Sequence, residues 1–131
     1  LLNGKYRSGV PDLWFGLVDV RDVARAHILA AQKEEASGRY LCVGTVAPIL
    51  EMAKILKQHF PDHPIPGKAV PTFLLYLAGP LMGFSWKFIR RNAGIPFRID
   101  SSRSLTLGLS YTPLEQTLLD HAGQLIRDGL V

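Results

Sequence analysis

Apolar residues in the first third of the chain form two continuous runs with a helical stripe between them. Residues 13–18 are bulky and apolar, which predicts a buried strand. From residue 20 to about residue 33 apolar side chains recur at helical spacing, and Gly38 suits the left-handed residue that ends a helix. The stripe expected to face inward is Val20, Val23, Ala24, His27, Ile28 and Ala31. A second apolar run at 39–43 predicts another strand, and this order is typical of a parallel crossover unit in an α/β fold.

The middle of the chain has mostly helical patterns. Pro48 is suited to start a helix that continues to residue 60 with Leu56 facing inward. Residues 70–86 carry no charge, but they are short for a membrane span and are interrupted by Gly79-Pro80, which favours a buried or pocket-lining pair of helices over a membrane contact. The expected fold class is therefore α/β but mostly helical, with two or three short strands at about 13–18, 39–43 and 96–99.

Two helix starts are predicted towards the end of the chain. Asp100 is suited to cap a short helix that Gly108 ends. Thr112, Pro113 and Glu115 then follow the order of a capping box, with Thr112 as the cap, Pro113 as the first helical residue and Glu115 reaching back. The last helix is expected to begin there.

Three charged residues, Asp19, Arg21 and Asp22, stand where the first predicted strand becomes a helix. Carboxylates at a helix start accept hydrogen bonds from free backbone N–H groups and meet the positive end of the helix dipole. Arg21 is placed to pair with one of them or with the neighbouring strand. We therefore predict that this charge knot has a structural role and holds two lobes of the protein together.

The composition is that of an ordinary globular protein. The 131 residues suffice for one domain, and 47% hydrophobic with 20% charged residues is ordinary for a globular chain. The net charge is +4 and the basic residues are scattered, apart from Lys87, Arg90 and Arg91, which favours a solvated helix face over a nucleic-acid site. A single cysteine, Cys42, excludes an internal disulfide and is typical of a cytoplasmic setting. The start has neither a signal peptide nor an initiator Met, so the chain is expected to begin inside a longer protein.

Conventional catalytic motifs do not occur in the sequence. The 12 glycines form neither a G-x-G-x-x-G fingerprint nor a phosphate loop, and no serine stands in a nucleophile elbow. The four histidines have no metal-binding spacing with Cys42 or the carboxylates. None of the four tyrosines is followed by lysine four residues later. No catalytic, cofactor-binding or metal-ligating residue is therefore predicted in this chain, and whether the chain alone is an enzyme stays open.

Two stretches resemble a known family. "FGLVDVRDVARAHILAA" followed by "SGRYLCVG", together with the tail "IDSSRSLTLGLSYTPLEQTLLDHAGQLIRDGLV", is similar to the C-terminal part of the extended short-chain dehydrogenase/reductases. The similarity is to the branch with dihydroflavonol reductase, cinnamoyl-CoA reductase and yeast-type aldehyde/ketone reductase. It covers residues 1–131, although residues 61–96 contribute little to it.

The resemblance implies a role within a larger enzyme. The Rossmann domain, with its dinucleotide loop and its Ser, Tyr and Lys, is expected to precede residue 1, and residues 20–43 are expected to complete the edge of its sheet. The full-length parent would bind NADP or NAD and reduce a carbonyl to an alcohol, whereas this chain would bind no cofactor and would be inactive alone. Its lobe would present apolar side chains to a small hydrophobic carbonyl substrate. The candidates are Phe73, Tyr76, Leu77, Met82 and Trp86.

Two other functions stay open at this point. The parent could be a nucleotide-sugar epimerase or dehydratase, because those relatives share the strand-to-helix layout. The chain could instead be a non-enzymatic module that binds a hydrophobic partner or a membrane surface through 70–91, where a Trp and basic residues follow the uncharged stretch. If the fragment stands alone, apolar faces at 13–18, 23–31 and 39–43 predict homo-oligomers.

Overall fold

The computed structural model describes the backbone of residues 1–131 and every side chain except those of Ala78, Leu81 and Met82. Helices predominate, as the sequence predicts. The elements in chain order are β1 (Trp14–Leu17), α1 (Val20–Gln32), β2 (Thr45–Pro48), α2 (Ile49–His59), α3 (Thr72–Ala78), the 3-10 turn η1 (Gly79–Met82), α4 (Trp86–Asn92), α5 (Ser102–Leu105) and α6 (Leu114–Arg127).

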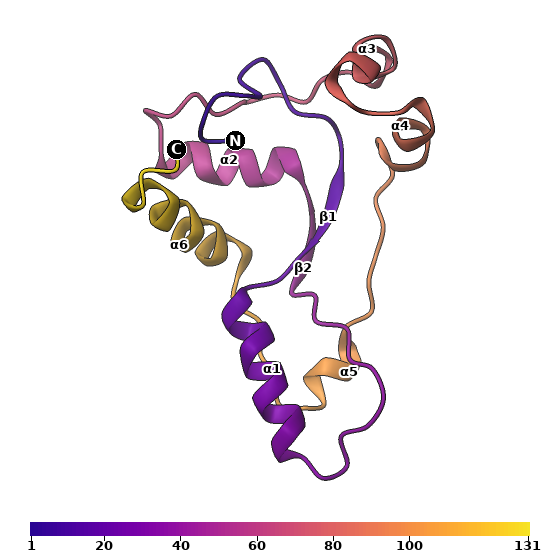
Figure 1. Ribbon diagram of the computed structural model, residues 1–131, viewed down its shortest axis with the longest axis vertical. Coiled ribbons are helices and arrows are strands. Elements are labelled where there is room, and N and C mark those ends of the chain that lie inside the picture. Colours follow the sequence, from indigo (N-terminus) through magenta and orange to yellow (C-terminus); the bar gives the residue numbers. More distant parts are fainter.

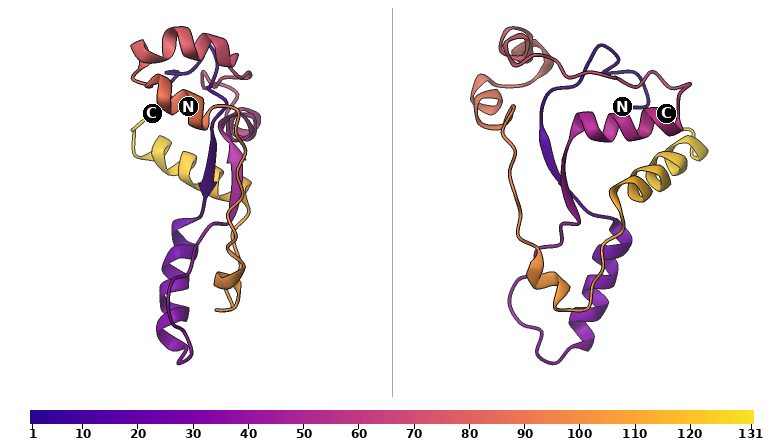
Figure 2. Two further views of the ribbon diagram at one scale, coloured as in Figure 1. Left: turned by 90° about the vertical axis from the view of Figure 1, so that its right-hand side faces the viewer. Right: turned by 180° about the vertical axis from the view of Figure 1, so that it is seen from behind.

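A two-stranded ribbon of β1 and β2 forms the centre of an elongated molecule (Figure 1). Helix α1 continues from one end of the ribbon with α5 beside it, and α2 and α6 lie together near the other end. Helices α3 and α4 lie together at that end but on the opposite side of the ribbon, as the view from behind in Figure 2 also shows. The connection from α4 to α5 runs back along the ribbon.

The parallel crossover unit expected over residues 13–44 is wrong. β1 pairs with β2 in antiparallel fashion, with Trp14 opposite Pro48 and Leu17 opposite Thr45. The ladder is extended by hydrogen bonds from the Gly44 N–H to the Leu17 carbonyl (2.8 Å) and from the Ile49 N–H to the Leu13 carbonyl (3.0 Å). An apolar run has the same appearance in a parallel and an antiparallel strand, so the pattern carried no information about direction.

Two of the three expected strands are also wrong in detail. The strand expected at 13–18 forms as β1, whereas residues 39–43 and 96–99 are not strands in this structure. β-structure needs a partner for its backbone groups, and the described residues offer no ladder to either segment. Ile99 instead lies over the ribbon, close to Gly16, where an added Cβ would meet the Ile99 Cδ1 at 3.1 Å.

The main hydrophobic core lies between α2 and α6 and not along α1. It consists of Leu2, Ala53, Leu56, Ile65 and Ala122, with Leu1, Phe60 and Leu118 packed at its edge. On α1 the buried residues are Asp22 and Ala26, whereas Val20, Ala24, His27, Ile28 and Ala31 of the expected inward stripe are exposed. The expected burial of this stripe is therefore wrong, because periodicity identifies an apolar face but not the element that covers it.

The capping box expected at Thr112 does not form. Helix α6 begins at Leu114, with Pro113 at the cap position and no side-chain cap. The Thr112 hydroxyl donates to the Asp22 carboxylate (3.0 Å), and the Glu115 carboxylate pairs with the His59 Nε2 (2.8 Å). Tertiary partners therefore replace the local ones. Asp100 is likewise not the cap of α5, because the cap position is Ser101 and has no side-chain cap, but the Asp100 carboxylate accepts from the Ser102 N–H (2.9 Å) at the start of that helix.

Candidate functional site

An apolar cavity of about 440 Å³ opens between the N-terminal segment, β1, the start of α2 and the region around α4. Its walls combine aliphatic and aromatic side chains from segments far apart in the sequence. They are Leu1, Tyr6, Val10, Pro11, Leu13, Phe15, Ile49, Met52, Phe84 and Phe88. Since no Asp, Glu, Lys or Arg is among them, the apolar cavity is suited to a hydrophobic molecule.

Backbone hydrogen bonds hold the N-terminal wall of this cavity in place. The Val10 N–H donates to the Lys68 carbonyl (3.1 Å), and the Val70 N–H donates to the Val10 carbonyl (2.7 Å). Gly9 precedes this pairing with φ +147°, and an added Cβ there would lie 2.9 Å from the Val70 Cγ2. A glycine is therefore required where the two segments come together.

The wall around α4 depends on a capped helix start. The Ser85 side chain accepts a hydrogen bond from the Phe88 N–H (3.2 Å). The rings of Phe84 and Phe88 stack with centroids 5.7 Å apart and planes inclined by 20°. The cap and the stack place two aromatic rings on the cavity, which gives a bound molecule flat apolar surfaces to contact.

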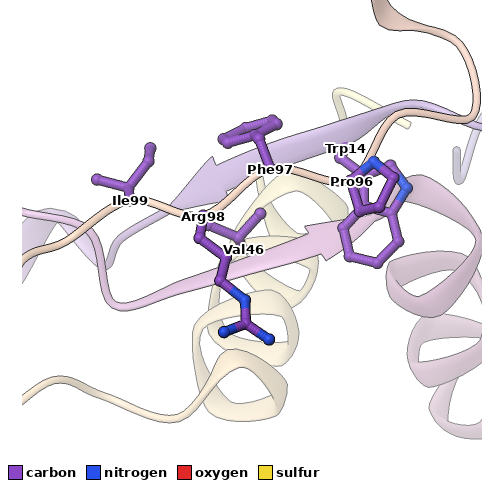
Figure 3. Close-up of a pocket in the computed structure, with 6 residues that line it drawn as sticks. All are labelled: Trp14, Val46, Pro96, Phe97, Arg98 and Ile99. Atoms are coloured by element: carbon purple, nitrogen blue, oxygen red, sulfur yellow. The ribbon is translucent and has the colours of Figure 1, made fainter.

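A second, more polar cavity of about 680 Å³ lies against the ribbon (Figure 3). It is lined by Trp14, Val46, Pro96, Phe97, Arg98 and Ile99. In Figure 3 Arg98 and Trp14 extend to the same side of the 96–99 segment, whereas Phe97 extends to the other side. This ribbon cavity therefore combines an indole ring with one cation.

The residues predicted from the sequence to line a substrate pocket lie elsewhere. Phe73, Tyr76 and Leu77 are exposed on α3, and Trp86 is exposed at the start of α4. The Trp86 indole N–H donates to the Tyr76 carbonyl (3.1 Å) and so ties the two helices together. None of these four lines the apolar cavity or the ribbon cavity, and the side chain of Met82 lies outside the described residues. Their assignment to a substrate pocket stays a prediction.

Sequence reasoning missed the aromatic walls of the apolar cavity. The spacing of Phe84 and Phe88, four residues apart, is the one signal that could have identified them, because such a pair lies on one side of a helical turn. Phe15 offered no comparable signal. It lies in β1 beside the start of α2 only because the chain returns in antiparallel pairing.

The charge knot joins the start of α1 to α6. Asp19 is buried, and both of its carboxylate oxygens accept two hydrogen bonds. Oδ1 accepts from the Arg21 backbone N–H (2.8 Å) and the Arg21 Nε (2.9 Å). Oδ2 accepts from the Arg21 Nη2 (2.7 Å) and the Thr117 hydroxyl (3.1 Å). Arg21 also pairs with Asp120 (2.6 Å). The geometry is that of a structural cap, since none of Asp19, Arg21 and Asp22 lines either cavity.

Asp22 makes the second link of the knot. Its carboxylate is buried and accepts from the Thr112 backbone N–H (2.7 Å) and from the Thr112 hydroxyl (3.0 Å), 90 residues away in sequence. A carboxylate that accepts two hydrogen bonds from one residue fixes both the position and the orientation of that residue. The segment leading into α6 is therefore held against α1.

The knot predicts a specific loss of stability in acid. Hydrogen bonds from the Arg21 side chain and backbone hold the pKa of Asp19 well below its usual range. Because this folded-state pKa lies below that of the unfolded chain, the stabilisation is fully present above about pH 4 and is lost as the pH falls towards the folded pKa. We expect the melting temperature, followed by circular dichroism, to fall between about pH 4 and pH 2 and to fall less in Asp19→Ala. Equal slopes for the two proteins would contradict this assignment.

The long helices among the described residues are not suited to hold the pyrophosphate of a dinucleotide cofactor. A pyrophosphate group is bound by backbone N–H groups at a helix start with no negative charge beside it. The three helices of more than ten residues all begin with acidic side chains: Asp22 in α1, Glu51 in α2 and Glu115 in α6. These carboxylates would repel phosphate, so no chemical step is assigned to a cofactor held by these residues.

Two further kinds of site are absent from the described residues. No group of three or more His, Cys, Asp or Glu side chains in that part of the chain is placed to hold a metal ion. None of its helices has both the length and the apolar composition needed to cross a membrane.

No protein-family model matches the chain. Similar sequences are plant reductases. Cinnamoyl-CoA reductase 1 of Oryza sativa subsp. japonica is 33% identical over 112 residues, which are 86% of this chain and 28% of the rice protein. An anthocyanidin reductase of Vitis vinifera is 37% identical over 94 residues, or 67% of this chain and 28% of that protein. The chain thus spans 28% of the length of these relatives.

The fold is also found in a solved structure. The yeast methylglyoxal/isovaleraldehyde reductase complexed with NADPH matches 97% of this chain and 39% of that chain, with a TM-score of 0.65 and 26% identity. The matching region is the C-terminal portion of a Rossmann-type reductase. The chain therefore belongs to the short-chain dehydrogenase/reductase family, on the branch of the cinnamoyl-CoA and anthocyanidin reductases, and corresponds to the C-terminal portion of its members.

Proposed function

We propose that this chain is the substrate-binding portion of an NADP(H)-dependent reductase that converts a hydrophobic aldehyde or ketone into an alcohol. The relatives are reductases, and one of them was solved with NADPH. The dinucleotide and the groups that transfer hydride and proton would be held outside the residues described here, since the long helices of these residues begin with carboxylates. The contribution of this chain is to bind and orient the rest of the substrate.

The apolar cavity carries this proposal. Its walls hold no charged side chain, and three phenylalanines stand among them: Phe15, Phe84 and Phe88. A substrate with an aromatic or aliphatic body would replace water on these surfaces, which favours binding in proportion to the apolar area buried. A substrate that is small and strongly hydrated would gain little from them.

Removing one aromatic wall is expected to weaken substrate binding without unfolding the protein. Phe15 is 42% exposed, so Phe15→Ala costs little core packing. A loss of about 1.4 kcal/mol of apolar contact corresponds to about a tenfold higher KM for hydrophobic carbonyls. The measurement is NADPH consumption by the protein that contains this chain, with an aromatic aldehyde and methylglyoxal as the two substrates. The KM for methylglyoxal is expected to change less.

Phe97→Ala is the matched control. Phe97 is 41% exposed, so the two variants remove the same ring from equally accessible positions, but Phe97 lines the ribbon cavity. We expect its KM values to equal those of the unmodified protein. An increase of KM in Phe97→Ala alone would move the substrate site to the ribbon cavity. The absence of NADPH consumption with every carbonyl tested would reject the reductase itself.

A further inference from the structure

We infer that the protein binds peripherally to membranes that contain anionic phospholipids, and that the outer surface of α3 and α4 makes this contact. This surface, called the α3–α4 face, is defined by Phe73, Leu77, Trp86, Lys87 and Arg91. The inference is independent of the proposed reductase function, because none of these side chains lines the apolar cavity or the ribbon cavity.

The buried residues of the two helices determine what faces outward. Leu75 of α3 and Ile89 of α4 are buried. Residues two positions before and after a buried residue lie about 200° away from it on a helix. In α3 these positions are Phe73 and Leu77, and in α4 they are Lys87 and Arg91. One helix therefore presents large apolar side chains to solvent, and its neighbour presents cations.

Several of the most exposed large apolar side chains of the described residues lie on this face. Leu77 is 78% exposed, Phe73 68% and Trp86 66%, and Tyr76 is also exposed. The Trp86 indole is tied to the Tyr76 carbonyl at 3.1 Å, which holds the aromatic ring beside α3. Water-exposed aromatic and aliphatic side chains in one place mark an interaction surface, and Trp is favoured where lipid meets water.

The charge distribution identifies the partner. Residues 63–99 contain no Asp or Glu, but they hold five cations: Lys68, Lys87, Arg90, Arg91 and Arg98. The rest of the chain holds the other ten of its 15 Lys and Arg and all 11 Asp and Glu. All of the net positive charge therefore belongs to the segment that contains α3 and α4. A negatively charged surface complements it.

Helix stability does not account for these cations. Arg90 and Arg91 in the last turn of α4 interact favourably with the helix dipole, but Lys87 lies in the first turn, where a cation is unfavourable. No ion pair found among the described side chains includes any of the three. They are therefore available to phosphate groups at a lipid surface.

The shape of the molecule allows the contact. In Figures 1 and 2, α3 and α4 project together at one end of the molecule, on the side of the ribbon away from α6. In such an interfacial contact the apolar side chains enter the headgroup region, and the cations stay at its surface.

Binding to vesicles tests the inference. The protein is mixed with phosphatidylcholine vesicles with and without phosphatidylserine, at low and high salt, and the bound fraction is measured by sedimentation. Each cation near an anionic surface strengthens binding about fivefold, so Lys87→Gln with Arg91→Gln is expected to lower the partition coefficient about 30-fold. The matched control is the double variant Lys54→Gln with Lys57→Gln, which changes two exposed lysines of α2. We expect this variant to lower the partition coefficient about twofold or less. Equal losses for the two pairs would contradict a specific face.

A second measurement reports on the face directly. In a Trp14→Phe background the fluorescence comes from Trp86, since the chain has two tryptophans. We expect the emission to shift to shorter wavelength on addition of phosphatidylserine vesicles and to return at high salt. An unmodified protein that neither sediments with vesicles nor shifts its emission would overturn the inference. Concentration-dependent self-association that Phe73→Ser with Leu77→Ser abolishes, without vesicle binding, would assign the face to a second copy instead.

Discussion

Asp19→Ala is expected to lower the melting temperature of the protein by about 6–10 °C. The substitution removes the cap of α1 and leaves the Arg21 N–H, the Arg21 guanidinium and the Thr117 hydroxyl without their buried acceptor. The link from α1 to α6 is lost with it. Thermal unfolding followed by circular dichroism at pH 7 measures the effect.

Asp100→Ala is the matched control for this substitution. Asp100 is exposed, and its carboxylate accepts one backbone hydrogen bond, from Ser102 at the start of the short helix α5. The same chemical change should lower the melting temperature there by only about 1–3 °C. If Asp19→Ala has no larger effect than Asp100→Ala, the charge knot does not hold the two segments together.

Leu56→Ala is expected to destabilise the protein by about 3 kcal/mol, because it leaves a cavity in the core between α2 and α6. Leu56 is 5% exposed and belongs to the buried cluster that also contains Ala53, Ile65 and Ala122. The close-packed side chains around it cannot relax enough to fill the space of a missing isobutyl group. Urea unfolding gives the free energy directly.

Ile28→Ala is the control, because it removes an aliphatic side chain from the surface of helix α1, where Ile28 is 57% exposed. Its expected cost is about 0.5 kcal/mol or less, since alanine has the better helix propensity and little burial is lost. A cost as large as that of Leu56→Ala would show that the outer side of α1 is covered in solution. The exposed stripe of α1 would then be an interface.

Local features were well predicted where the partner lies within a few residues. The start of α1 with its Asp19 cap, the start of α2 after Pro48, and the break of the uncharged stretch at Gly79-Pro80 all agree with the structure. Capping and backbone restriction act over one helical turn, so the sequence contains all the information that they need.

Predictions failed where two partners competed. Thr112 had a local role as a helix cap, but the buried carboxylate of Asp22 accepts from both its N–H and its hydroxyl. The apolar stripe of α1 had the correct period, yet Asp22 and Ala26 are the buried residues of that helix. For Thr112 the deciding partner is 90 positions away in the sequence, and no local pattern reports on it.

The walls of the apolar cavity could not be predicted from the sequence, because they come from three separate segments, 1–15, 49–52 and 84–88. Phe15, Ile49 and Phe88 line one cavity only after β1 and β2 pair in antiparallel fashion and α4 is placed beside them. Phe73 and Leu77, which the family resemblance and their apolar character indicate as pocket residues, are exposed on α3, and their role in a substrate pocket stays a prediction.

The sequence by itself determined the family, the helical character, a carboxylate cap at Asp19 or Asp22, and the acid-free stretch of 63–99. These depend on residue order and on contacts within one helical turn. The tertiary structure alone decided the strand direction, the side on which each helix is buried, and which aromatic rings meet around the apolar cavity. The physical reason is that burial and hydrogen bonding join segments that are far apart in the sequence. A group that leaves water takes the partner that best replaces its contacts with water, and a local pattern does not identify that partner.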